Sequence, residues 1–208
     1  MKPFPNRTNP AVGALHSDRR GVAAVEFALV APLLIMAIMG GMDLGYQAYA
    51  GSVLQGALND VSRTGSLEDP ELNCTGTTTE AQIACAVKKR SNTVARNATY
   101  DFDINSYYEF SGVGRSEKLV TDYNHNGQYN AGDCFQDLNE NGTFDTTAGR
   151  DGIGGADDVV FYDVTLTMPR LFPVASLIGW SSEYEIRATS AVRNQPYTRQ
   201  STPPTVCV

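Results

Sequence analysis

Histidine and basic residues are scarce in this sequence, and their scarcity argues against two classes of function. The chain of 208 residues has two histidines, and its 16 Lys and Arg are outnumbered by 23 Asp and Glu, which gives a net charge of -7. Nucleic acids bind basic surfaces, so we expect no nucleic-acid partner. His16 lies near the N-terminus and His125 inside an acidic segment. No acid–base pair or activated nucleophile is evident, so we expect no enzymatic activity.

Cysteine is also sparse, and all of it lies in the C-terminal two thirds of the chain. Four cysteines, an even number, suit an oxidising compartment. Because short loops close most easily, we favour the pairs Cys74–Cys85 and Cys134–Cys207 over the two other pairings. Four free thiols are the alternative.

The sequence has one long hydrophobic run, residues 22–42, in which Glu26 is the only charged residue. As a helix with a rise of about 1.5 Å per residue, this run spans about 30 Å, the hydrocarbon thickness of a bilayer. The charges before it are basic (Lys2, Arg7, Arg19 and Arg20), so the positive-inside rule places the N-terminus in the cytoplasm and the C-terminal part outside that membrane.

Helical periodicity continues beyond the hydrophobic run, and we predict one helix from Val22 to about Ser66. Pro32 is expected to kink it at most. The continuation carries apolar residues at three- and four-residue steps: Tyr46, Tyr49, Val53, Leu54, Ala57, Leu58 and Val61. We therefore divide the chain into a leader (1–21), a transmembrane and amphipathic helix (22–67) and an extracytoplasmic domain (68–208).

The start of this helix has a specific pattern, in which Gly21 is followed five residues later by Glu26 and then by Phe27. The segment resembles the TadE-like minor pseudopilins of the tight-adherence (Tad or Flp) type IV pilus system. The resemblance is close over residues 18–68 and looser over 158–197, where residues 191–196 resemble the end of the family's extracytoplasmic domain. It implies a pilin-like fold and cleavage by a prepilin peptidase between Gly21 and Val22.

The resemblance also implies a role for Glu26 in assembly, where it would meet the amine of a neighbouring subunit, with Phe27 beside it. The implied partners are other pilins and pseudopilins, the prepilin peptidase and the assembly platform of the bacterial inner membrane. Two simpler interpretations remain open. Glu26 could extend to the lipid headgroups from a plain membrane anchor. A signal peptidase could instead cut before Gly51, after the small residues Ala48 and Ala50.

Residues 121–158 contain a repeated acidic pattern of the kind found in calcium loops. Counted from Asp122, oxygen-bearing side chains stand at positions one, three, five, seven, nine and twelve around Gly127 at position six. The pattern returns fifteen residues later from Asp137. The predicted ligands are Asp122, Asn124, Asn126, Gln128, Asn130 and Asp133 in the first loop, and Asp137, Asn139, Asn141, Thr143 and Asp145 in the second.

Position twelve of the second loop is Ala148, so we expect a carboxylate from elsewhere to complete it, with Asp151, Asp157 and Asp158 as candidates. We predict weak, structural Ca²⁺ binding of extracellular type, in loops without EF-hand helices. The alternative is that Asp, Asn and Gly simply form turns here.

Taken together, these patterns predict an α+β protein: a long N-terminal transmembrane helix, then a small antiparallel-sheet domain with a helix near residues 81–95 and strands near 102–110, 160–168 and 184–192. The calcium-type loop pair is an insertion. The function that the resemblance implies is that of a structural or assembly component of an adhesive pilus. The alternative is an anchored or secreted calcium-dependent binding module unrelated to pili.

Overall fold

The computed structural model describes residues 20–172, 176, 179–195 and 197–208. The expected leader therefore lies outside the described residues, except for its last two residues, which begin the first helix.

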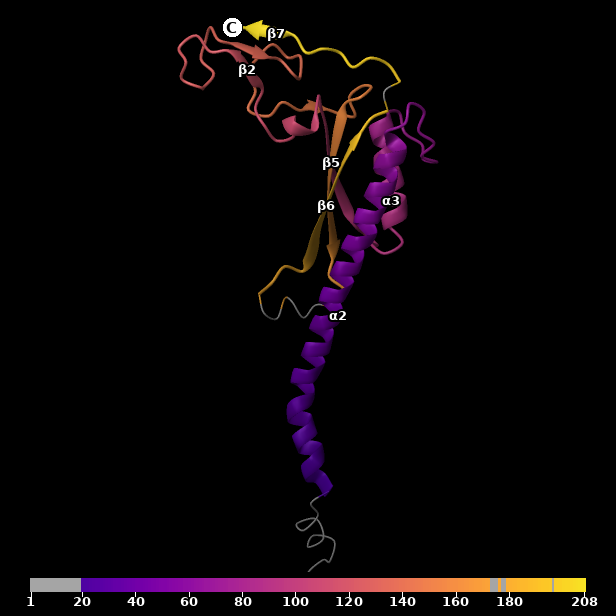
Figure 1. Ribbon diagram of the computed structural model, residues 1–208. Helices are drawn as coiled ribbons and strands as arrows, with labels where there is room; N and C mark the ends of the chain where they lie inside the picture. The colour runs from indigo at the N-terminus through magenta and orange to yellow at the C-terminus, as the bar shows by residue number, and fades with distance from the viewer. Residues whose placement is uncertain (1–19, 173–175, 177–178, 196) are drawn as a thin grey trace, which may run out of the picture.

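The first described element is α2, Arg20–Gly65, a single helix of 46 residues that continues through Pro32. Its N-terminal half extends away from the rest of the molecule as a free rod, and its C-terminal half packs against the sheet (Figure 1). The predicted single helix over residues 22–66 is confirmed.

A second, shorter helix, α3 (Thr79–Ser91), packs beside the end of α2. The Thr78 hydroxyl caps it by accepting a hydrogen bond from the Ala81 amide at 3.2 Å. The helix ends four residues before the predicted Ala95, because residues 92–94 form a turn in which Val94 and Ala95 both donate backbone hydrogen bonds to the Ser91 carbonyl.

The body is built on an antiparallel four-stranded sheet in the order β4–β1–β5–β6. The strands are β1 (Thr99–Tyr107), β4 (Arg150–Asp151), β5 (Val159–Pro169) and β6 (Glu183–Arg193). The three long strands were predicted. The first begins and ends three residues earlier than expected, and Phe110 instead begins a 3-10 turn, η1 (Phe110–Gly112).

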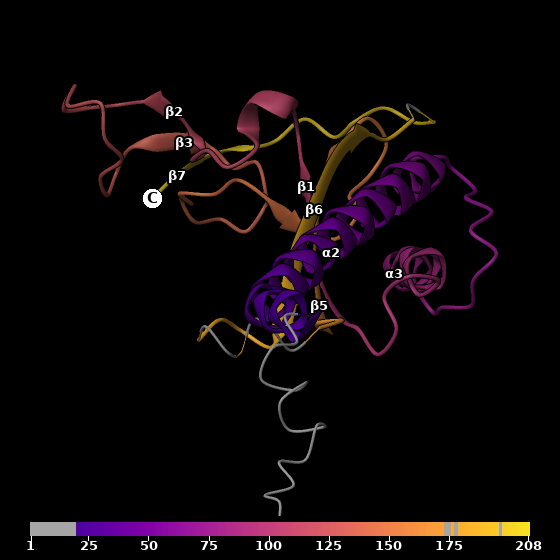
Figure 2. The same ribbon diagram turned by 90° about the horizontal axis from the view of Figure 1, so that it is seen from below.

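Both helices cover one face of this sheet, as the view from below shows (Figure 2). The hydrophobic core lies between the two helices and the sheet. Leu54, Leu58 and Val61 of α2 and Ile83 and Val87 of α3 are fully buried, as are Tyr162, Val164 and Leu166 of β5 and Tyr184 of β6. The amphipathic half of α2 is therefore an integral part of the body.

A second, smaller sheet forms a lobe at the end of the body farthest from the start of α2 (Figure 1). Its strands are β2 (Lys118–Thr121), β3 (Cys134–Gln136) and β7 (Thr205–Cys207), in the order β2–β3–β7. We call residues 117–149 together with β7 the distal lobe. These short strands were not predicted, because three or four residues are too few to display an alternating pattern.

The structure contains the two disulfides that loop length favoured. Cys74–Cys85 ties the segment before α3 to that helix, and Cys134–Cys207 joins β3 to β7. The second bridge holds the C-terminal strand on the distal lobe.

Candidate functional site

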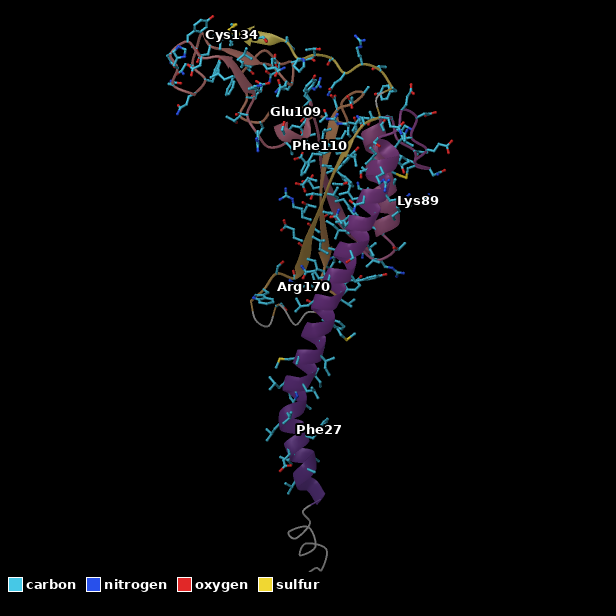
Figure 3. The ribbon with its side chains drawn as sticks, viewed as in Figure 1. Phe27, Lys89, Glu109, Phe110, Cys134 and Arg170 are labelled. Atoms are coloured by element: carbon cyan, nitrogen blue, oxygen red, sulfur yellow. A yellow bond between two sulfur atoms is a disulfide. The ribbon has the colours of Figure 1, made fainter. Side chains whose placement is uncertain are left out.

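The N-terminal half of α2 is an exposed apolar surface of membrane length. Within Gly21–Gly65 the mean hydropathy reaches 2.4, and none of that most apolar stretch is buried by the rest of the molecule. Phe27 is 67% exposed and projects from the helix far from the body (Figure 3). The helix is thus long and apolar enough to cross a membrane once.

Glu26 stands alone on this surface. Its side chain is exposed, and it makes no hydrogen bond or ion pair with any of the described residues. Gly21, at the start of the same helix, has no atom within 4 Å of the place where a Cβ would stand. Neither residue therefore has a role in the packing of the described chain.

Asp43 is a buried charged residue that directly follows the apolar half of α2. Arg170 Nη1 donates a hydrogen bond to the Asp43 carboxylate at 2.6 Å, and both side chains are largely buried. The Tyr184 hydroxyl donates to the same residue, and the Arg170 guanidinium lies 4.7 Å from the centre of the Tyr184 ring. Burial raises the pKa of Tyr184 to about 12, and the hydrogen bond to Asp43 contributes. This cluster fixes α2 to the end of β5 and the start of β6.

The first acidic loop folds around its own carboxylates. Asp122 accepts a hydrogen bond from the Gly127 amide at 2.7 Å, and this contact lowers the pKa of Asp122. Asp133, at position twelve, accepts from the amides of Tyr123 and Asn130 at 3.0 and 2.9 Å. The position-twelve carboxylate thus closes the loop by binding the backbone at positions two and nine.

The second loop has the same geometry, although its position twelve is Ala148. Asp137 accepts from the Gly142 amide at 2.8 Å, as Asp122 does from Gly127. Glu117 accepts from the amides of Leu138 and Asp145, positions two and nine, at 2.7 and 3.1 Å. Its side chain is buried, and this burial raises its pKa despite the backbone hydrogen bonds that oppose the shift. Glu117 therefore occupies the structural place of the missing twelfth residue.

The candidates that the sequence analysis named for that place are engaged elsewhere. Asp158 binds Arg150 at 3.2 Å and the Gly155 amide at 2.7 Å, and Asp157 pairs with Arg193 at 3.2 Å. Asp151 lies in β4, paired with Asn105 of β1. The structure assigns the closing carboxylate of the second loop to Glu117, which no spacing rule had indicated.

The two loops also contact each other through aromatic residues at matching positions. Tyr129 and Phe144, both at position eight, stack face to face, and both rings lie nearly perpendicular to the ring of buried Phe135 in β3, with centroids 5.5 Å away. The repeat in the sequence is therefore a paired structure, with each loop supporting the other.

The two loops present oxygen donors that a metal ion could use. Asp122 Oδ1 is shut off from solvent and has no hydrogen-bond partner in the described structure. Such an oxygen is suited to a cation. No cluster of three or more His, Cys, Asp or Glu side chains able to hold a metal is found among the described residues. Amide oxygens supply much of the remaining donor set in each loop, which suits a hard cation bound weakly.

Comparison with known proteins supports the identification of the N-terminal helix. Comparisons with curated proteins and with solved structures gave no match. The family model of TadE-like proteins matches residues 21–63, which cover most of α2 and leave residues 191–196 outside. The TadE-like character read from Gly21, Glu26 and Phe27 is therefore confirmed over residues 21–63.

Proposed function

We propose that this protein is a minor pseudopilin, a structural or assembly component of a Tad/Flp-type adhesive pilus with no catalytic role. The observation that carries the proposal is the single carboxylate on an exposed, membrane-length helix whose sequence matches the TadE-like family. Before assembly the helix spans the bacterial inner membrane once, with its N-terminus in the cytoplasm and the body in the periplasm.

The proposed processing step is cleavage between Gly21 and Val22 by a prepilin peptidase. This cut makes Val22 the N-terminus and puts an ammonium group one helical turn from Glu26. A carboxylate in apolar surroundings costs free energy unless it has a partner, and the described chain offers Glu26 none. The amine of a neighbouring subunit in the assembly platform or filament supplies that partner, and the pair fixes the register of assembly.

The test uses the host cells, with Gly21→Ala and Glu26→Gln as separate variants. Gly21→Ala is a clean change, because the described structure leaves space for the added methyl group. We expect a mature chain beginning at Val22 in the wild type and an uncut chain in Gly21→Ala. We expect Glu26→Gln to be cut and membrane-bound but to reduce piliation.

The matched control is Glu68→Gln, which removes an exposed charge beyond the end of α2. Normal piliation in Glu26→Gln would contradict the proposed assembly role. A chain that begins at Gly51 would contradict the proposed processing, and would favour the second candidate function, a secreted calcium-dependent binding module.

We also propose that the paired loops of the distal lobe bind Ca²⁺. The orphaned Asp122 oxygen supports one site, and the position of Glu117 supports a second site with the same plan. The first would use Asp122, Asn124, Asn126 and Asp133, and the second Asp137, Asn139, Asn141 and Glu117. Bound calcium would neutralise carboxylates that crowd one lobe and would hold the loops together.

Calcium titration calorimetry on the detergent-solubilised full chain tests this proposal. We expect two weak sites, of which Asp122→Asn removes one and Glu117→Gln the other, with little competition from Mg²⁺. Glu140→Gln is the control, because Glu140 belongs to the second loop but occupies a position without a ligand role. Absence of calcium-dependent heat in the wild type would contradict calcium binding and would support the alternative that the loops are turns without a metal.

A further inference from the structure

The connection between β5 and β6 begins and ends beside the point where α2 leaves its apolar half. Arg170 directly follows β5, and its guanidinium binds Asp43, the first residue after the apolar run. Tyr184, the second residue of β6, binds Asp43 from the other strand. Figure 3 places Arg170 at the end of the body nearest the free part of α2. The cluster thus sets the height of this connection along the helix.

This position along the helix axis coincides with the surface of any bilayer that α2 crosses. Residues 22–42 span about 30 Å, so Asp43 lies at the start of the headgroup layer. The two described ends of the connection are then held within the same layer.

The residues exposed at this level have the chemistry of a membrane interface. Leu171 is 53% exposed and Trp180 is 61% exposed, although both are large and apolar. Residues 171–182 contain no charged side chain. Tryptophan favours the boundary between headgroups and acyl chains, where its ring is buried and its N–H stays hydrated.

The flank of α2 at the same height continues this surface. Tyr49 is exposed, and a groove beside it is lined by Tyr46, Arg96 and Leu171. Tyrosine and arginine are also interfacial residues, because they combine an apolar body with a polar end. Side chains of α2 and of the β5–β6 connection therefore line one groove at this end of the body.

We propose that Leu171 and Trp180 insert into the headgroup layer of the bilayer and hold the body against the membrane before assembly. The occupant of this surface is lipid, because the connection is fixed through Arg170 to the helix that crosses the bilayer immediately below it. The inference rests on membrane insertion of α2, which the proposed function shares, and does not depend on pilus assembly.

Trp180 is the only tryptophan in the chain, so its fluorescence reports this position alone. The experiment reconstitutes the full chain in phosphatidylcholine vesicles that carry bromine at a shallow or a deep acyl position. We expect loss of most of the Trp180 emission with shallow bromines, less loss with deep ones, and weak quenching by aqueous acrylamide. The matched control is Trp180→Phe combined with Phe110→Trp. Phe110 is 53% exposed in η1, away from the free half of α2 (Figure 3).

The control should be quenched by acrylamide and not by brominated lipid. Insertion itself is checked by resistance of the protein to alkaline extraction from the vesicles. An inserted protein whose Trp180 behaves like the control overturns this inference and leaves the proposed function intact. A protein that fails to insert overturns both. Protection of Trp180 from both quenchers at high protein density, lost at one chain per vesicle, would assign the surface to a second copy and overturn the lipid assignment.

Discussion

The rings of Tyr129 and Phe144 stack with their centroids 4.3 Å apart and their planes 7° from parallel. The two residues hold the same position in consecutive loops, and each ring also makes a T-shaped contact with Phe135. The repeated sequence therefore produces two loops that share one aromatic cluster.

Removal of one ring should loosen both loops. Phe144→Ala deletes the stack and part of the packing on Phe135, so we expect it to destabilise the distal lobe by roughly 1–3 kcal/mol. Hydrogen exchange should quicken at the amides of Gly127 and Gly142, one in each loop. Tyr129→Phe keeps the ring and serves as control. Faster exchange confined to the second loop would contradict this effect on both loops.

Loss of the Glu117 charge should open the second loop selectively. Glutamine offers one acceptor oxygen where the carboxylate now binds the amides of both Leu138 and Asp145. We expect Glu117→Gln to lower the free energy of unfolding by about 1–3 kcal/mol. Glu140→Gln, an exposed change in the same loop, should cost less than about 1 kcal/mol. Amide exchange read by NMR distinguishes the two, and unchanged protection of Leu138 in Glu117→Gln would refute the closing role.

The two disulfides should differ in their effect on stability. Cys134–Cys207 closes a loop with a sequence separation of 73 and Cys74–Cys85 one of 11. Chain entropy then assigns about 4 kcal/mol to the first and about 3 kcal/mol to the second. Denaturant titration of the two paired Cys→Ser variants measures the difference. The reverse order would show that strain or residual structure outweighs loop entropy here.

Alkaline pH should weaken the attachment of the body to α2 through Tyr184. The pKa of this phenol is raised from 10.0 to about 12 in the folded protein, mainly by burial. A raised folded-state pKa contributes stability that is fully present below pH 10 and is lost as the pH rises through about 12. The difference in tyrosinate absorbance between the wild type and Tyr184→Phe isolates this group. Asp43→Asn should lower the pKa, because the carboxylate favours the protonated phenol. A pKa of Tyr184 near 10 would contradict the buried contact.

Much of the fold could be predicted from periodicity, because long elements repeat their pattern several times. The bounds of α2 followed from the apolar run and the stripe that ends at Val61, and β5 and β6 alternate over eleven residues each. The short strands of the distal lobe carry no such pattern. Their pairing depends on the Cys134–Cys207 bridge and on contacts between segments far apart in the chain.

The candidate site residues could likewise be predicted where they lie close together in the sequence, and could not where they lie far apart. Gly21, Glu26 and the two loops could be found because their residues lie close together in the sequence at fixed spacing. Glu117 precedes its loop by 20 residues and has no fixed spacing to it. The only sign in the sequence was that position twelve of the second loop, Ala148, is not acidic. This sign shows that a carboxylate is missing but does not show which acidic residue of the chain replaces it. The partners of Asp43 lie 127 and 141 residues away, so only the folded sheet brings them together.

Because α2 is one continuous helix from Arg20 to Gly65, it fixes the direction in which the body projects from the helix axis relative to the direction of Glu26. Each helical residue turns the chain by about 100°, so one residue inserted between Glu26 and Asp43 would swing the whole body around the helix axis by that angle. An insertion of seven residues, close to two full turns, would nearly restore the original direction around the helix axis. It would move the body along that axis by about 10 Å. The distance along this helix and the angle around it are thus separable, and a set of insertions would reveal which of the two an assembly partner requires.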